Sequence, residues 1–544
     1  MTQKFSIFNF QFLILLFIVL LASFLRLYQL SNVPPSASLD EASIGYNAYS
    51  ILKTGADEYG SRFPILLRAY DDWRPALYVY FVVPFVKLFG LNVLSVRLPS
   101  VILSILIVFA TYFLTRELFK KKEGTNASYI ALFSSFLLAI SPWHIYISRL
   151  GHEANLGLVF FVFALTFFFF RKFYFSFIFF ALSFASYQSE KIIIPLFLLF
   201  LLFLFRKEVL RKRKEAVVSF FILCIIMLPF LIATFSGNAL IRFKGTNAFD
   251  RNSIAFQVQI KNYQKAVENN DFLGKLVNNR RTYAPKIFFS NYIAHFNPNW
   301  LFLNKNNDKH KVPNIGLFYL FEIPLILFGF LALFLKKIDR KIKIFIIFWL
   351  LVSPLAASIT NDAPHAMRSY TFLPSWQILG ALGFVLVLSY VKKSIKYAFL
   401  TLFGILTVWG LMNLYLNYYI IFPKEQSNSF QYALSKAIPF VLQNEKKYDS
   451  IIFSNKENLY QSYMFFLFYS KYDPDIYRKE GGTKSGGFAE THSFGKYRFE
   501  PIEFTKMRKG NVLFVGNIND FPDNTKIVQT FDNLNGNPAI VIVE

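Results

Sequence analysis

Long apolar runs alternate with short polar connections over most of the chain. The first run lies at 11–30 and includes "FQFLILLFIVLLASFL", close to the roughly 20 residues that a helix needs to cross the hydrocarbon core of a membrane. Further apolar runs lie at 99–118, 129–147, 156–170, 173–187, 192–205, 216–235, 313–335, 343–360, 370–391 and 397–420. Together they predict an all-α polytopic bundle of about eleven transmembrane helices.

One apolar run, "PALYVYFVVPFVKLFG" at 75–90, is shorter and contains Pro84 and Lys87. If it crossed the membrane, every later basic loop would change sides. Without it, "RELFKKKE", "RKEVLRKRK", "KKIDRKIK" and "KKSIK" alternate with loops poor in Lys and Arg, as the positive-inside rule expects of cytoplasmic loops. We therefore expect 75–90 to lie flat on the outer surface. The N-terminus is then cytoplasmic, and 31–97, with its juxtamembrane helices, and 236–312 are outer loops.

The pattern changes after residue 420. The runs "YDSIIFSN", "GNVLFVGN" and "PAIVIVE" are short and typical of strands, and "NLYQSYMFFLFYSKY" between them is typical of a helix. These features predict two parts, a transmembrane domain at 1–420 and a small extracytoplasmic α/β domain at 421–544.

Composition agrees with a membrane protein, because 54% of the residues are hydrophobic and only 17% are charged. The net charge is +25, but the basic residues fall in loops between apolar runs and do not form a nucleic-acid-binding surface. The single cysteine, Cys224, excludes a disulfide within the chain. We expect a multi-pass protein of the plasma membrane whose partners include the bilayer and no nucleic acid.

Candidate chemistry begins with Asp40 and Glu41 in "SASLDEASIGYN", directly after the first span. One interpretation is a solvated turn in which the aspartate caps the next helix. The other is a catalytic pair, since a carboxylate at the membrane surface can act as general base toward a hydroxyl. The later outer segment "GHEAN" adds His152 and Glu153, and "NDAPHAMRSY" adds His365.

Several cations share the predicted outer face, and an anionic leaving group needs such residues. The candidates for binding a phosphate are Arg74, Arg149 and Arg368, with Lys191 as a further possibility. The alternative is that they are interfacial residues that only set the topology.

A divalent metal is possible, because Glu41, His152 and His365 are suitable ligand types. Their spacing does not match an HExxH zinc site, and histidines at helix ends are commonly just hydrogen-bonded. Glu322 in "GLFYLFEIPLILFG" is the acidic residue expected well inside a helix. It is neutral, paired or lining a cavity, and the sequence does not choose among these.

Four stretches in order, "PPSASLDEASIGYNAYSILKTGADEYG", "DWRPALYVYFVVPFVKLFGLNVLSVRLPS", "AISPWHIYISRLGHEANLGL" and "PHAMRSYTFLPSWQILGALG", resemble bacterial members of the dolichyl-phosphate-mannose protein mannosyltransferase superfamily. That group comprises glycosyltransferase family 39 and its aminoarabinose transferase relatives. The resemblance implies a C-type glycosyltransferase fold and an inverting, mannosyltransferase-like enzyme. Such an enzyme takes a sugar from a polyprenyl-phosphate donor to a lipid, glycan or protein hydroxyl on the extracytoplasmic face.

The resemblance also implies roles for particular residues. Asp40 corresponds to the acidic residue that activates the acceptor hydroxyl, and Glu153 to a second acidic residue after the third helix. Arg74 stands before a proline where relatives usually have lysine, and it would face the donor phosphate together with Arg368. No cofactor is required, because the activated phosphate arrives on a lipid.

Two other classes of function remain open. A transporter or lipid flippase would also be polytopic, although transporters tend to place charge near the middle of the membrane. An inactive relative that acts as a scaffold would have the same sequence pattern.

Overall fold

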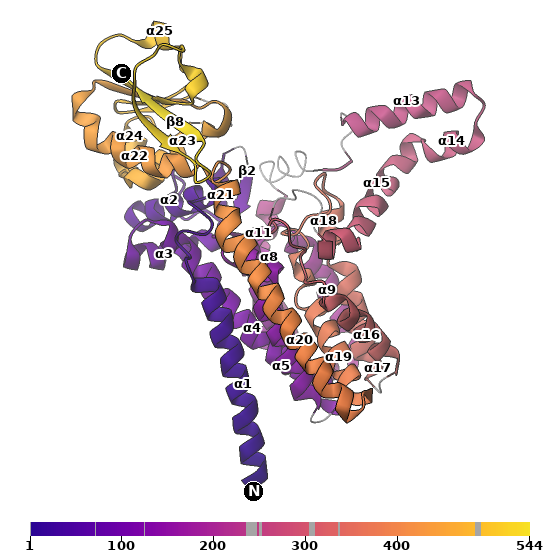
Figure 1. The fold of residues 1–544 in the computed structure, drawn as a ribbon. Helices are drawn as coiled ribbons and strands as arrows, with labels where there is room; N and C mark the ends of the chain where they lie inside the picture. Colours follow the sequence, from indigo (N-terminus) through magenta and orange to yellow (C-terminus); the bar gives the residue numbers. More distant parts are fainter. Residues whose placement is uncertain are drawn as a thin grey trace. The chain divides into compact units, whose positions relative to one another are not determined.

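The computed structural model describes residues 2–70, 72–123, 126–235, 247–249, 253–303, 310–335, 338–484 and 491–544. It contains two compact units, which are described separately. The helical unit comprises Met1–Ala22, Ser104–Ile147 and Ala154–Leu411, and the mixed unit comprises Ser23–Leu103, Ser148–Glu153 and Met412–Glu544. Figure 1 shows the helices and strands along the chain.

Each of the eleven apolar runs predicted from the sequence contains a helix. They are α1(Thr2–Leu27), α4(Val93–Glu123), α5(Asn126–Ile140) with α6(Pro142–Ser148), α7(Glu153–Phe169), α8(Phe173–Ser186), α9(Glu190–Leu204), α11(Arg213–Thr234), α16(Glu322–Leu335), α17(Arg340–Val352) with α18(Leu355–Ser358), α19(Ser375–Tyr390) and α20(Lys393–Leu414).

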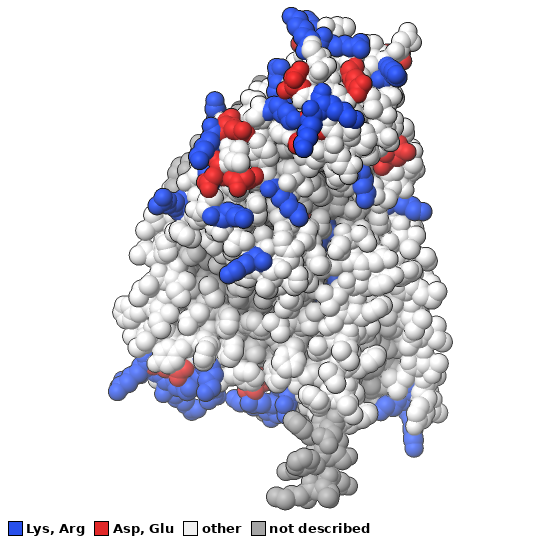
Figure 2. Space-filling view, turned by 90° about the vertical axis from the view of Figure 1, so that its left-hand side faces the viewer, with Lys and Arg blue, Asp and Glu red and all other residues white. Residues whose placement is uncertain are grey.

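Six of the described helices are long and apolar enough to cross a membrane, and the pair α5 and α6, bent by 58°, gives a seventh if it counts as one span. Helices α7, α8 and α16 are apolar but shorter. The chain is therefore a mostly helical protein with several apolar helices, while the number of eleven crossings remains a prediction. Figure 2 shows Lys and Arg at the lower rim of one face and a broad zone almost free of charge above them.

Close helix contacts hold the helical unit together. A Cβ on Gly383 would lie 1.9 Å from the carbonyl oxygen of Leu325, and one on Gly329 would lie 2.1 Å from that of Leu379. Only glycine permits this approach of α16 and α19, a packing common between membrane helices.

The sequence predicted an apolar helix at 313–335 with Glu322 well inside it. In the structure, α16 begins at Glu322 and does not extend back to 313, so this prediction is wrong. The segment before Glu322 consists of turns and bends. It is closely packed, because a Cβ on Gly316 would lie 2.4 Å from the backbone of Phe302. The backbone N–H of Tyr319 donates to Glu322 Oε1 at 3.0 Å. Glu322 thus closes the turn before the helix, at the end where the helix dipole favours a carboxylate.

The connections also contain helices. Within the long loop predicted at 236–312 the structure describes α13(Ile254–Glu268), α14(Phe272–Val277) and α15(Arg280–Ala294), while 236–246, 250–252 and 304–309 lie outside the described residues. The other short helices are α10(Arg206–Arg211), α21(Phe422–Gln426) and α25(Phe504–Met507).

After the end of α1, the mixed unit continues with the segment that the sequence predicts to be the first outer loop. Helix α2(Leu39–Thr54) is followed by the antiparallel hairpin of β1(Leu66–Ala69) and β2(Asp72–Pro75), and then by α3(Leu77–Phe89). With 13 residues, α3 is only about 20 Å long, too short to cross the hydrocarbon core. It packs on α2, in agreement with the prediction that 75–90 does not cross the membrane.

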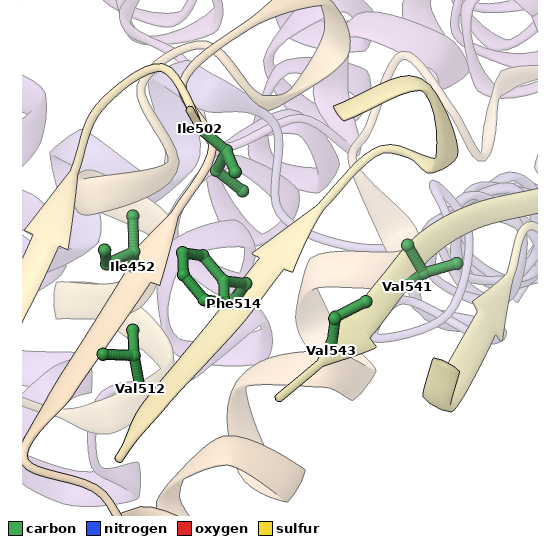
Figure 3. Packing of buried hydrophobic residues seen from close by; sticks show 6 residues of the cluster. All are labelled: Ile452, Ile502, Val512, Phe514, Val541 and Val543. Carbon is green, nitrogen blue, oxygen red and sulfur yellow. The ribbon is translucent and has the colours of Figure 1, made fainter. Parts of the chain in front are cut away.

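The tail forms a mixed sheet with strand order β4-β5-β3-β6-β8-β7, in which β3 is parallel to β5 and β6. The strands are β3(Ser450–Phe453), β4(His492–Phe494), β5(Tyr497–Phe499), β6(Val512–Gly516), β7(Ile527–Asp532) and β8(Pro538–Val543), and the helices are α22(Tyr432–Asn444), α23(Ser462–Ser470) and α24(Pro474–Lys479). Figure 3 shows the core against the sheet, formed by Ile452, Ile502, Val512, Phe514, Val541 and Val543.

The tail is joined to the first outer loop within one compact unit, so a separate domain starting at 421 remains a prediction. Glu58, which lies just after α2, is fully buried and accepts hydrogen bonds from Asn47 Nδ2 at 3.1 Å and from Thr483 Oγ1 of the tail at 2.9 Å. Burial raises the pKa of Glu58 to about 7. A carboxyl group that titrates near neutral pH therefore links the tail to α2.

Candidate active site

The start of α2 places the two neighbouring carboxylates. Ser38 is the N-cap, and its Oγ accepts from the Glu41 N–H at 3.2 Å, while Glu41 Oε2 accepts from the Ser38 N–H at 2.8 Å. This capping box shows that the cap is Ser38 and not Asp40, which corrects the capping alternative raised from the sequence. Successive residues of a helix point about 100° apart, so Asp40 and Glu41 face different surroundings.

Glu41 is 1% exposed and lies among hydrogen-bond donors. Its Oε1 accepts from Arg97 Nε and from the Gly151 N–H, both at 2.8 Å. Its Oε2 accepts from Arg97 Nη2 at 2.9 Å in addition to the Ser38 N–H. Because each oxygen already accepts two hydrogen bonds, this geometry favours a positioning role for Glu41 over proton transfer.

Asp40 has a side chain that is 49% exposed. Its Oδ1 accepts from Arg74 Nη2 at 2.9 Å, and its Oδ2 lies 4.0 Å from His152 Nε2. The carboxylate is thus oriented on one side by a cation and is still reachable from solvent.

Arg74 lies on β2, opposite Leu67 in the hairpin, with only 5% of its side chain exposed. Burial alone would lower the pKa of the guanidinium, but the nearby carboxylates of Asp40 and then Glu153 raise it above the ordinary value. Arg74 therefore stays charged, and its positive charge favours the ionised form of Asp40.

Gly151, His152 and Glu153 approach α2 from the start of α7. A Cβ on Gly151 would lie 2.9 Å from the carbonyl oxygen of Val96, so only glycine fits where its N–H reaches Glu41. The next residue, His152, has its Nδ1 3.5 Å from Glu153 Oε2. Glu153, which is 2% exposed, is the first residue of α7. Asp40, Arg74, His152 and Glu153 thus form one cluster of two carboxylates, an arginine and a histidine in the mixed unit.

Arg149 has different surroundings from those expected of a phosphate ligand. It is fully buried, and its guanidinium donates to the carbonyl oxygens of Arg26 and Val33, both at 2.7 Å, and of Leu25 at 3.3 Å. The same group stacks on Tyr419, 5.0 Å from the ring centroid. These contacts satisfy the carbonyls at the end of α1 and favour a structural role for Arg149.

Arg97 is the residue that the sequence reasoning missed. It is fully buried, pairs with Glu41, and also donates to the carbonyl oxygens of Leu30, Pro34 and Ser36. The sequence does contain a signal for this role. Arg97 stands next to the apolar run at 99–118, and a charged residue at such a position requires a partner.

The other candidates belong to the helical unit. Lys191 is half-buried in the first turn of α9. His365 Nδ1 accepts from the Arg368 N–H at 3.2 Å, and the Arg368 guanidinium lies 3.7 Å from the carboxylate of Asp362. The His365 N–H in turn donates to Nε2 of His295, whose pKa burial lowers to about 4. His295 is therefore neutral at physiological pH and accepts this hydrogen bond.

Among the residues that the structure describes, no group of three His, Cys, Asp or Glu side chains is arranged to hold a metal ion. Of the metal candidates, Glu41 already has protein donors on both oxygens. A divalent metal at His152 or His365 remains an untested expectation.

Comparisons with known proteins support the resemblance. The family model "Dolichyl-phosphate-mannose-protein mannosyltransferase" matches residues 73–232. The structure of ArnT from Cupriavidus metallidurans bound to undecaprenyl phosphate is similar, with a TM-score of 0.54 and 12% identity over 99% of this chain and 98% of that chain. A search of curated proteins finds no significant match.

The archaeal oligosaccharyltransferase AglB from Archaeoglobus fulgidus, in complex with an inhibitory peptide and a dolichol-phosphate, also has a similar structure. Its TM-score is 0.50 at 14% identity, over 85% of this chain and 63% of that chain. The match thus spans under two thirds of AglB. At these identities the two structures establish the fold, and the activity has to be argued from the site.

Proposed function

We propose that this chain, whose residues 73–232 match the protein mannosyltransferase family model and whose fold is similar to that of ArnT, transfers a sugar from a polyprenyl-phosphate donor to a hydroxyl group. The transfer takes place on the extracytoplasmic face of the plasma membrane and inverts the anomeric carbon. The observation that carries the proposal is the half-exposed Asp40 carboxylate oriented by the buried Arg74 guanidinium.

In this mechanism Asp40 is the general base. The acceptor hydroxyl attacks the anomeric carbon, its proton passes to the Asp40 carboxylate, and a new glycosidic C–O bond forms. The bond between the anomeric carbon and the phosphate oxygen breaks, and its electron pair leaves with the polyprenyl phosphate. A positioned base typically contributes about 10² to 10⁴-fold to such a step. His152, whose Nε2 lies 4.0 Å from Asp40 Oδ2, would help to position the base, and Glu153 in turn lies next to His152.

Cations are expected to bind the donor phosphate. Arg74 is one, because it is charged and adjoins the base. In the helical unit, Arg368 is proposed separately as a phosphate ligand, because its Nη1 is buried and has no hydrogen-bond partner among the described residues. A buried unpaired donor costs roughly 1–3 kcal/mol, so such a group is expected where a ligand supplies the acceptor. The dolichol-phosphate and undecaprenyl phosphate bound in AglB and ArnT support a donor of this class.

The acceptor is a lipid, glycan or protein hydroxyl. Mannose is the first donor sugar to be tested. The face of transfer follows from the basic loops, which place the first outer loop outside the cell. Asp40 follows α1 closely along the chain, at the point where a lipid-linked sugar presents its anomeric carbon.

The test is transfer of radiolabel from a panel of polyprenyl-phosphate sugars by the purified protein with host membrane extract. Asp40→Asn is compared with Asp475→Asn, a control that also alters an exposed aspartate paired with an arginine, at 2.7 Å from Arg478. We expect transfer by the wild type and the control and none by folded Asp40→Asn. No consumption of any donor, or full activity of Asp40→Asn, would overturn the proposal and leave the transporter, flippase or scaffold as the better interpretation.

A further inference from the structure

A cavity of about 720 Å³ lies in the helical unit between α1, α5, α19 and α20. Its size is within the ~300–1,000 Å³ of typical ligand sites. Among the described residues that line it, one is charged, Lys396, and none is acidic. The cavity is independent of the residues assigned to sugar transfer.

The greater part of the cavity is apolar and aromatic. Phe133 and Phe384 stack at 3.8 Å between ring centroids, and Phe136 and Leu388 continue this surface. On the α1 side, Phe17 lines the cavity and is 62% exposed. An opening bordered by an exposed phenylalanine on an apolar helix is accessible to hydrocarbon chains, so the apolar part suits an acyl chain.

Polar groups gather at one end of the same cavity. Asn126 is the first residue of α5, Lys396 lies in the first turn of α20, and Ser389 lies at the end of α19. Two helix N-termini therefore contribute to this end, and neither α5 nor α20 has an acidic residue in its first turn. Helix N-termini attract anions, and Tyr129, 49% exposed, supplies an aromatic hydroxyl of the kind enriched at membrane interfaces.

We infer that this cavity binds an anionic phospholipid, with an acyl chain against Phe133 and Phe384 and the headgroup phosphate at Lys396. The charge complementarity of the lysine and the helix N-termini selects an anionic headgroup over a zwitterionic one. Lys396 belongs to the segment "KKSIK", and Asn126 follows "FKKKE" closely along the chain. Both segments are expected to face the cytoplasm under the positive-inside rule, where anionic phospholipids attract basic residues. A polyprenyl-phosphate donor, by contrast, is needed at the outer face of the proposed reaction.

The test is native mass spectrometry of the full chain with added phosphatidylglycerol, phosphatidylcholine or undecaprenyl phosphate. Lys396→Gln is compared with Lys392→Gln, which removes an exposed lysine just before α20 that does not line the cavity. A single lysine near an anionic lipid is worth about 1 kcal/mol, so we expect roughly fivefold weaker phosphatidylglycerol binding for Lys396→Gln and none of this loss for Lys392→Gln.

Leu388→Trp, which fills the apolar part, is expected to abolish phosphatidylglycerol retention in protein that still elutes as a folded monodisperse species. Equal effects of the two lysine substitutions, equal binding of phosphatidylcholine, or displacement of phosphatidylglycerol by undecaprenyl phosphate would each overturn the inference. Because binding is measured without sugar transfer, these outcomes are independent of whether the proposed enzyme activity is correct.

Discussion

The substitution Glu41→Gln tests whether the two neighbouring carboxylates have separate roles. The Glu41 carboxylate accepts four hydrogen bonds, two of them from the buried Arg97 guanidinium. Glutamine keeps one oxygen, so the two donors that faced the other oxygen meet an amide N–H instead, and Arg97 loses its counter-charge. Removing one partner of a buried ion pair costs roughly 3–5 kcal/mol, and we expect a loss of this size in the free energy of unfolding.

Asp40→Asn is the matched comparison, because it makes the same chemical change one residue earlier. Asp40 is half exposed, whereas its partner Arg74 is buried. Asparagine keeps an oxygen that can accept from Arg74 Nη2, and Glu153 remains as a second carboxylate near the guanidinium. We therefore expect Asp40→Asn to unfold close to the wild-type temperature while losing sugar transfer. Glu41→Gln is expected to unfold at a clearly lower temperature.

The assay is thermal unfolding of the purified protein in one detergent, combined with the radiolabel transfer measurement. In the double variant Glu41→Gln with Arg97→Met, both buried charges are gone, but the carbonyls of Leu30, Pro34 and Ser36 also lose their donor. We therefore expect the double variant to lose less stability than the sum of the two single variants. Wild-type unfolding of Glu41→Gln with loss of transfer equal to that of Asp40→Asn would refute the division of roles.

Three further predictions concern neighbouring features. Arg74→Ala should lower kcat/KM for the donor by roughly 10- to 100-fold, with Arg74→Lys intermediate and protein yield unchanged; equal loss of yield and activity would indicate a structural arginine. Gly151→Ala should destabilise by about 1–3 kcal/mol in thermal unfolding, whereas Gly404→Ala, where nothing lies within 4 Å of an added Cβ, should not. The pKa of Glu58 is raised from 4.5 to about 7, so its contribution to stability is complete below pH 4.5 and is lost as the pH rises through about 7. Wild-type unfolding temperature should fall over this window, and Glu58→Gln should reduce the slope; an unchanged slope would contradict it.

The hydrophobic pattern predicted the helices well, because apolar runs of this length form helices wherever lipid or a protein core surrounds them. The charge pattern also kept 75–90 out of the set of spans, in agreement with the short helix α3. The start of α16 was missed, because hydropathy does not register the turn that Glu322 closes onto the Tyr319 N–H.

Part of the predicted set of site residues lies together in the structure, namely Asp40, Arg74, His152 and Glu153. Arg149 instead binds backbone carbonyls, and the catalytic roles of the four residues remain predictions. Glu41, however, pairs with Arg97, which lies 56 residues away along the chain. The periodic patterns of apolar residues predict helices and strands, but they do not predict which distant residues pair. For the same reason, nothing in the sequence near Arg149 indicated its contacts with carbonyls more than 100 residues earlier.

The turn that follows α1 has a consequence for biosynthesis. The carbonyl groups of Leu30, Pro34 and Ser36 accept hydrogen bonds from Arg97, and those of Leu25, Arg26 and Val33 accept from Arg149. Both arginines leave the ribosome after the turn itself. Backbone hydrogen bonds within the turn can form early, but its contacts with arginine side chains are complete only when both residue 97 and residue 149 have been made. The nascent protein is therefore expected to remain inactive while its first helices enter the membrane, and to gain a site only when later segments arrive.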